Sequence, residues 1–257
     1  MLKLPKIAQS IIWLALICLA WEISSRMGLV SSYMVPPFSA AATRMWQQLF
    51  TGNLGVQVFN SLKIVLLGVA LSILLSIFVT GLCIMSKLFE SFISTVSNTF
   101  NTLPNMAILP VFMIWLGIGN NVMLALIVYS VLFPLQINLL AGIRAIPGVY
   151  REYARNIQLN PISELTHILI YAILPYFLSG LRQGWGRAWR ALIGAEMVFG
   201  MIGTMGGLGF YLFMNRAHAN VTNVFAGLII IIIVGILVEQ IFNIIEKETI
   251  VKWDMSR

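Results

Sequence analysis

The stretch LPYFLSGLRQGWGRAWRALIGAEM, from Leu174 to Met197, is long enough to cross a membrane as one helix, because about 20 residues at a rise of about 1.5 Å each span the hydrocarbon core. It nevertheless carries four charged side chains among apolar and small residues: Arg182, Arg187, Arg190 and Glu196. An arginine at the bilayer centre costs roughly 2.5 to 3.5 kcal/mol on insertion scales, so a lipid-facing helix with three of them is excluded. We therefore expect this helix to pack on protein, with polar partners or water for its charges.

The composition of the whole chain is that of a membrane protein. Of its 257 residues, 59% are hydrophobic and only 10% are charged, and the mean hydropathy is +0.91, far from ordinary globular usage. Apolar runs of spanning length predict transmembrane helices near residues 7–25, 62–85, 92–116, 122–143, 173–201 and 222–245. The expected fold class is an all-α polytopic membrane protein with about six transmembrane helices, organised as one domain over residues 1–257.

The positions of lysine and arginine predict the orientation, because cytoplasmic loops retain positive charge during insertion. With six spans, Lys3, Lys6, Lys87, Arg144 and the basic C-terminal end fall on one side. Both termini are then cytoplasmic, and the linker of about residues 28–60 is extracytoplasmic. This asymmetry and contact with anionic lipid explain the net charge of +7, so no nucleic-acid partner is needed.

The first span also resembles a signal peptide, since Lys3 and Lys6 precede an apolar core. No small-x-small cleavage site follows it, and Ile17 stands where a lipobox before Cys18 needs a small residue. We expect an uncleaved anchor. Cys18 and Cys83 lie inside predicted spans, far apart in sequence, and we interpret them as packing residues.

The segment between the fourth and fifth spans, about residues 146–172, is the least membrane-like part of the interior. Val149 and Tyr153 recur at helical spacing on one face, and Asn160 followed by Pro161 has the form of a helix start. We expect two short helices, folded back on each other at the cytoplasmic face. From the pattern alone they form either an amphipathic hairpin on lipid or a plug that docks into a partner.

A series of short motifs runs through the chain: Val35-Pro36-Pro37, Trp115-Leu116-Gly117-Ile118-Gly119, Ala141-Gly142-Ile143-Arg144, Glu152-Tyr153-Ala154, Ala195-Glu196-Met197 and Gly207-Leu208-Gly209-Phe210. Their order and spacing resemble the permeases of ATP-binding-cassette (ABC) importers, in the sulfonate, nitrate and taurine branch. Glu152-Tyr153-Ala154 is similar to the cytoplasmic EAA loop of that family. The chain departs from the family pattern at Gln158, where glycine is usual, and at Ile170-Tyr171, where Leu-Pro is usual.

This resemblance implies a type I ABC importer permease-like fold and a division of work among subunits. Two permease copies, expected to be identical, form the pathway in the bacterial cytoplasmic (inner) membrane, and an extracytoplasmic binding protein delivers the solute. Separate cytoplasmic ABC ATPase subunits use ATP and Mg. The loop of about residues 146–172 then couples the permease to the ATPase through Arg151, Glu152, Tyr153, Ala154, Arg155, Gln158, Leu159, Asn160 and Pro161.

The chain has no sequence pattern for chemistry of its own. It lacks a G-x-x-x-x-G-K-[ST] phosphate loop, and its nine acids and two histidines form no catalytic or metal-binding pattern. We therefore predict no catalytic residue, no metal and no bound cofactor. Glu196 is a candidate counter-ion of Arg187 and Arg190, within the chain or from a second copy. Both direct solute contact and a structural core network remain open for five residues: Asn138, Arg187, Trp189, Arg190 and Glu196.

Other residues predict how the helices pack. Gly180 and Gly184 form a small-xxx-small pair that permits close approach by another helix. Gln136, inside the fourth span, is expected to hydrogen-bond between helices. Arg182 is expected to reach the headgroups or the cytoplasmic loop. Prolines inside the spans are expected to kink or break helices around a cavity: Pro104, Pro110 and Pro134.

The sequence therefore predicts the membrane-spanning subunit of an ATP-driven importer, with a small organic or inorganic anion such as a sulfonate, taurine or nitrate as solute. The alternative is a self-sufficient secondary carrier or channel, which needs a coupling-ion site built from intramembrane acids and internal repeats. The acids Glu22, Glu196 and Glu239 are scattered, which disfavours that alternative. A membrane-embedded enzyme needs clustered ligands or acid–base pairs, which the sequence does not show.

Overall fold

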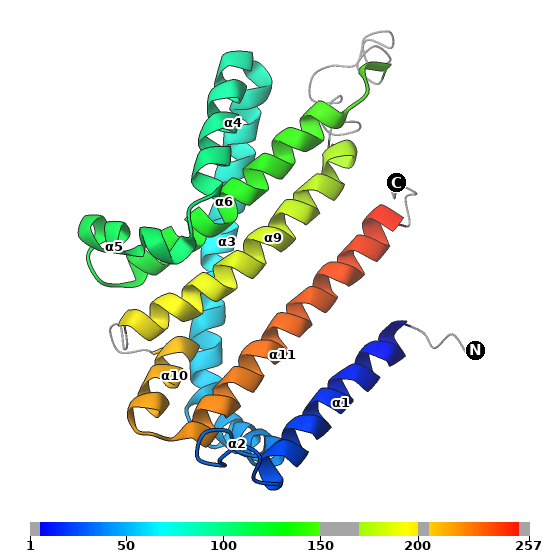
Figure 1. Cartoon of the computed structure of the whole chain (residues 1–257). Coiled ribbons are helices and arrows are strands. Elements are labelled where there is room, and N and C mark those ends of the chain that lie inside the picture. The colour runs from blue at the N-terminus through cyan, green and yellow to red at the C-terminus, as the bar shows by residue number, and fades with distance from the viewer. Residues whose placement is uncertain (1–5, 150–169, 200–205, 252–257) are drawn as a thin grey trace. The chain divides into compact units, whose positions relative to one another are not determined.

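The computed structural model describes residues 6–149, 170–199 and 206–251, and every regular element within these ranges is a helix (Figure 1). The helices are α1 (Lys6–Arg26), α2 (Phe38–Phe50), α3 (Leu54–Met85), α4 (Lys87–Asn101), α5 (Asn105–Leu116), α6 (Asn120–Ala145), α9 (Ile170–Phe199), α10 (Leu208–Ala217) and α11 (Val221–Glu246). A π-helical turn, Lys247–Val251, follows α11. The all-α prediction is confirmed.

Three helices in the described ranges are long and apolar enough to cross a membrane: α3, α6, and α11 with its extension to Thr249. The helices α4 and α5 reach that standard only as a pair. The helices α1 and α9 cover the first and fifth predicted spans, but they are not among these three helices. In α9, arginines and small residues lower the hydropathy. The count of six spans is consistent with these helices and stays a prediction.

The span predicted near residues 92–116 is divided into α4 and α5, with a bend of 105° between them. The helix break expected at Pro104 is confirmed. The α4 helix ends at Asn101, and Pro104 forms the N-cap of α5 with ψ of 132°. Proline disfavours helical geometry in the residue before it, here Leu103, so the helix cannot continue through this point. Pro110 and Pro134, in contrast, lie inside α5 and α6.

The described residues form two compact units. The first contains the residues up to Asn60 together with 196–234, and the second contains 61–195 together with the residues from Gly235 on. The organisation of the chain as one domain stays a prediction.

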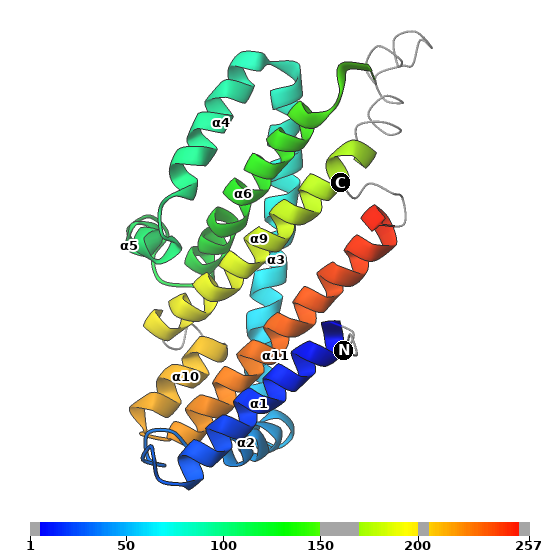
Figure 2. The ribbon, with the colours of Figure 1, turned by 45° about the vertical axis from the view of Figure 1, so that its right-hand side comes forward.

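The centre of the second unit is α6, whose Val122, Leu126, Ile127 and Leu135 are fully buried. The helices α4 and α5 pack against it, and α9 runs beside it in the opposite direction (Figures 1 and 2). Small residues form the contact between α6 and α9. A Cβ atom added to Gly180 would lie 3.0 Å from Leu135 Cα, and one added to Gly184 would lie 3.0 Å from Val131 Cα. The predicted close approach at this glycine pair is confirmed.

Polar and apolar contacts also join α6 to α3 within the second unit. Gln136 Nε2 donates a hydrogen bond to Thr80 Oγ1 at 3.1 Å, and both side chains are buried. The predicted interhelical hydrogen bond of Gln136 is therefore confirmed. One turn further along α3, Cys83 is buried in an apolar cluster with Leu140 and Ile143, as expected for a packing residue.

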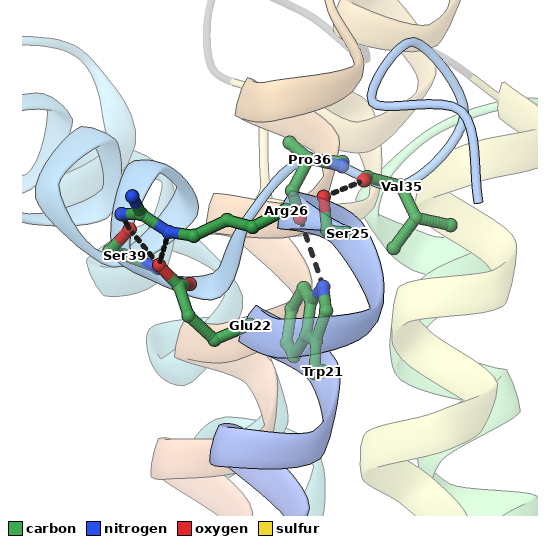
Figure 3. Close-up of polar contacts among 7 residues, drawn as sticks. All are labelled: Trp21, Glu22, Ser25, Arg26, Val35, Pro36 and Ser39. Carbon is green, nitrogen blue, oxygen red and sulfur yellow. Dashed lines mark hydrogen bonds and ion pairs between the residues drawn. The ribbon is translucent and has the colours of Figure 1, made fainter. Parts of the chain in front are cut away.

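The first unit is organised around the C-terminal end of α1 (Figure 3). Trp21 Nε1 donates to the Pro36 carbonyl at 2.9 Å, and Ser25 Oγ donates to the Val35 carbonyl at 2.8 Å. Glu22 accepts from the backbone N–H of Ser39 at 2.9 Å, in the first turn of α2, where a carboxylate stabilises the positive end of the helix. The Val35-Pro36-Pro37 motif thus connects α1 to α2, and side chains of α1 hold this connection in place.

Candidate functional site

The first charge of α9, Arg182, is held by three residues of α11. Its guanidinium pairs with the Glu239 carboxylate, donates to Asn243 Oδ1 at 2.8 Å and contacts Glu246 Oε2 at 3.1 Å. The three partners are spaced by four and three residues, so they lie on one face of α11. Arg182 therefore has protein partners on a neighbouring helix, which sequence reasoning had not identified.

The buried carboxylate of Glu196, near the C-terminal end of α9, lies at the start of α10. Its side chain is 2% exposed, and Oε2 accepts from the backbone N–H of Gly209 at 2.7 Å. Gly207 is the N-cap of α10, and a Cβ atom at this glycine would overlap the Glu196 carboxylate. The negative charge stabilises the N-terminal end of α10. The Glu196 carboxylate, from the motif Ala195-Glu196-Met197, thus contacts the motif Gly207-Leu208-Gly209-Phe210 at the start of α10.

The second charge of α9, Arg187, is half-buried and reaches the C-terminal end of α4. Its Nη1 donates a hydrogen bond to Asn101 Oδ1. The same helix end is held from α6, where the hydroxyl of Tyr129 donates to the Phe100 carbonyl at 2.6 Å. Phe100 also stacks on Phe133 of α6, with ring centroids 5.6 Å apart. The partner of Arg187 is therefore neutral and firmly placed.

Arg190 is the remaining charge of α9, and its side chain is exposed. Its guanidinium folds back towards Gly186, four residues earlier on the same helix. Within residues 6–149, 170–199 and 206–251 it makes no hydrogen bond and no ion pair. Arg190 thus keeps its five N–H donors available.

Arg187 and Arg190 line a pocket of about 380 Å³ at the break between α4 and α5, which we call the α4–α5 pocket. The other lining residues are Asn101, Thr102, Leu103, Pro104, Asn105, Met106 and Ala191. None of these lining residues is acidic. Two guanidinium groups without a lining carboxylate make the pocket electropositive, and it suits a small anion.

A second pocket, of about 540 Å³, lies within the first unit and is lined by Arg26 and Arg44 among hydroxyl and amide side chains. Arg26 pairs there with Glu22 at 2.6 Å, and Figure 3 shows this ion pair. Arg44 donates to Asn223 Oδ1 at 2.8 Å and to Gln47 at 3.3 Å. Arg26 and Arg44 therefore already have side-chain partners within the first unit, whereas Arg190 has none in the described residues.

The other predicted site residues are placed less directly. Trp189 is buried and stacks on Trp185 at 6.2 Å between ring centroids, and Asn138 donates to the Pro134 carbonyl of its own helix at 2.8 Å. Neither lines the α4–α5 pocket. The predicted coupling residues Arg151, Glu152, Tyr153, Ala154, Arg155, Gln158, Leu159, Asn160 and Pro161 lie outside the described residues.

Sequence reasoning did not identify Asn101 as a partner of Arg187. This asparagine lies inside the predicted span 92–116, and no motif around it marks it as a site residue. Sequence reasoning also did not connect Arg44 with Asn223, which are 179 residues apart. Among the described residues, no three His, Cys, Asp or Glu side chains are grouped so as to hold a metal ion.

The fold and the pocket together define a helical membrane protein with an electropositive pocket between its helices. The chain belongs to the family of binding-protein-dependent transport system inner membrane components, whose model matches residues 68–251. It is 28% identical over 247 residues to the putative aliphatic sulfonates transport permease protein SsuC of Bacillus subtilis (strain 168), covering 94% of this chain and 86% of that protein.

Two further relatives carry different solute names. The nitrate import permease protein NrtB of Synechocystis sp. is 28% identical over 195 residues, which cover 76% of this chain and 70% of that protein. The taurine transport system permease protein TauC of Escherichia coli (strain K12) is 25% identical over 239 residues, which cover 91% and 86%. The resemblance found in the motifs is confirmed, and the chain is a permease subunit of an ABC importer and not a self-sufficient carrier.

Proposed function

We propose that this permease subunit forms the import path for a small anion such as a sulfonate, taurine or nitrate. The relatives that are named for a solute support this class. The observation that carries the proposal is the distribution of partners along α9. Arg182 is neutralised by acids, Glu196 stabilises a helix end, and Arg187 has a neutral partner. Arg187 and Arg190 thus bring two charges without an acidic partner in the described residues to one pocket, and Arg190 has no hydrogen-bond partner there either.

The coupling to ATP hydrolysis is assigned to the loop of about residues 146–172. In this proposal the loop docks into a groove on a separate ABC ATPase subunit, with Glu152 at its centre. ATP and Mg are bound by that partner, and this chain has neither an ATPase site nor a cofactor. The support is the similarity of Glu152-Tyr153-Ala154 to the family's loop, within the matched range 68–251.

The assembly that follows contains two copies of this chain, ATPase subunits and an extracytoplasmic binding protein, in the bacterial inner membrane. Both termini are cytoplasmic in this arrangement. Two ion pairs support the topology behind that orientation: Lys87 and Arg144, which the charge rule puts on the same side, both pair with Glu90, at 3.3 and 2.7 Å.

The solute class is tested with the complete transporter in proteoliposomes, after its partners have been identified by co-purification. We expect ATP-dependent uptake of taurine, methanesulfonate or nitrate, and no uptake of an uncharged solute of similar size. ATP-driven uptake of only the uncharged solute would refute the anion assignment.

The coupling role is tested by Glu152→Lys, which reverses the charge of the proposed docking loop. We expect uptake to be lost while the protein still reaches the membrane, because ATP hydrolysis no longer moves the permease. The control Lys247→Gln changes charge at an exposed residue near the C-terminus. Full uptake by Glu152→Lys at normal membrane levels would contradict the proposal.

A further inference from the structure

The α4–α5 pocket offers many hydrogen-bond donors to a ligand. Arg190 is exposed and without a partner in the described part of the chain. Asn105 and Met106, which also line the pocket, are the first two residues of α5. The N–H groups of a first helical turn have no partner within the helix, and the end of the helix is positive. The two arginines and this helix end therefore point to an anion with several acceptor oxygens.

Arg187 has a different status from Arg190, because Asn101 Oδ1 already accepts from its Nη1. Both residues line the pocket. An unpaired guanidinium in a partly buried position is costly, so the amide oxygen stabilises the empty pocket. A neutral acceptor binds a guanidinium more weakly than an anionic oxygen does. Asn101 therefore holds Arg187 in place without preventing an anion from taking its position.

We infer that the α4–α5 pocket binds the oxyanion group of the solute, and that Asn101 takes the place of an anion oxygen on Arg187 while the pocket is empty. The inference rests on the proposed anion import and adds the site that contacts the anion. Arg187 and Arg190 are three residues apart on one helix, so one group with two or three oxygens spans both guanidiniums. A sulfonate and a nitrate share this chemistry.

The direct test measures access to the pocket. Leu103 lines it and is 44% exposed. In the complete transporter carrying Cys18→Ser and Cys83→Ala, the Leu103→Cys substitution introduces a reporter thiol. Its rate of reaction with N-ethylmaleimide is compared in sodium methanesulfonate, in sodium nitrate and in sodium gluconate of equal ionic strength. At about ten times the dissociation constant, a bound anion leaves about one site in ten free, so we expect reaction to slow about tenfold.

A variant of Arg190 and a matched variant of Lys247 separate a specific site from general screening. We expect Arg190→Gln, which removes an exposed charge without a partner in the described residues, to abolish the protection, taken as the ratio of the rates without and with anion in the same variant. Lys247→Gln removes a charge elsewhere and should keep it. Absence of protection in the parent protein, or equal loss of protection in both variants, overturns the inference.

Variants of Asn101 distinguish its proposed place-holding role on Arg187 from a purely structural role. Asn101→Asp supplies a carboxylate that competes with the anion for Arg187, so protection should require at least about tenfold more anion. Asn101→Ala leaves Arg187 without this partner, so protection should occur at the same or a lower concentration. Equal weakening by both substitutions would refute the role of Asn101.

The two proposals can fail separately. If the transporter takes up an anion with ATP but the anion does not protect the thiol of Leu103→Cys, the anion site at the α4–α5 pocket is refuted and the proposed function is retained. Protection by methanesulfonate or nitrate in a transporter that takes up only uncharged solutes keeps an anion site and removes the proposed solute class.

Discussion

The close packing of α6 on α9 at two glycines makes a quantitative prediction, because α9 carries the arginines of the pocket. In Gly184→Ala the new Cβ would lie 3.0 Å from both Cα and Cγ1 of Val131. In Gly180→Ala it would lie 2.9 Å from Asn138 Cβ and 3.0 Å from Leu135 Cα. Backbone atoms cannot rotate away, so α9 must move from α6.

The size of the effect follows from two opposing contributions. Overpacking at such a close approach costs about 1 to 3 kcal/mol, while alanine is favoured over glycine inside a helix by about 0.5 to 1 kcal/mol. Matched controls isolate the second contribution, because a Cβ at Gly81 in α3 or Gly235 in α11 meets no atom within 4 Å. We expect Gly81→Ala and Gly235→Ala to be neutral or stabilising, and Gly184→Ala to be less stable than either by about 1 to 3 kcal/mol.

The assay is the unfolding of the detergent-purified protein by heat or denaturant. Val131→Ala is combined with Gly184→Ala as a double-mutant cycle, since it removes the Cγ1 methyl group and leaves the backbone of residue 131 equally close to the new methyl group. We expect partial recovery. Gly184→Ala as stable as the Gly235→Ala control would refute the claim that backbone proximity fixes the position of α9.

Three further predictions concern polar contacts. Glu196→Gln keeps an acceptor for the Gly209 N–H but removes the charge at the start of α10, so stability should fall by about 0.3 to 2 kcal/mol in the same unfolding assay; no change would show that the charge is unimportant. Arg182→Ala combined with Glu239→Gln should give a coupling energy of only about 0.2 to 1 kcal/mol, because both side chains are partly exposed; a larger value would mean that lipid excludes water from the pair. Gln136→Leu should change stability by less than about 1 kcal/mol, because two contributions oppose each other. The substitution removes a hydrogen bond of about 0.6 kcal/mol, but it also removes a buried amide oxygen that has no partner in the described ranges. A larger loss of stability would contradict this expectation.

The apolar helices could be predicted from sequence because hydropathy alone determines them. The predicted spans 62–85, 122–143 and 222–245 correspond to α3, α6 and α11 with small shifts at most ends. The larger shift, at the start of α3, concerns a helix that begins at Leu54, outside the most apolar run. The sequence predicted that prolines kink or break helices, but it could not tell Pro104, where the helix ends, from Pro134, which lies inside α6, because proline is tolerated in some membrane helices.

The sequence identified Arg187 and Arg190, which line the α4–α5 pocket, as candidates, but it did not identify the partners of the charges on α9. Intramembrane charges stand out in a sequence, which is why Arg187 and Arg190 were candidates. Asn101 lies 86 residues from Arg187, and Glu239 lies 57 residues from Arg182. No local pattern joins such pairs. The carboxylate of Glu196, the candidate counter-ion for the arginines, accepts from the backbone N–H of Gly209 in α10; its pairing with an arginine of a second copy stays a prediction. The sequence did not reveal the contact with Gly209, because the open N–H groups of a helix start are placed only when the chain has folded.

The charges of α9 differ in whether they have a structural partner or are available to a ligand. Arg182 and Glu196 have partners that stabilise the fold whether or not a solute is present. Arg190 has none in the described residues, so its guanidinium depends on water in the pocket for solvation. An anion that enters the pocket replaces that water with a charged partner, and the interaction strengthens as water leaves. In the proposed site, Arg190 therefore gains a charged partner only when an anion binds. This is the property expected of a solute-contacting residue, and one that a residue of the folding core does not have.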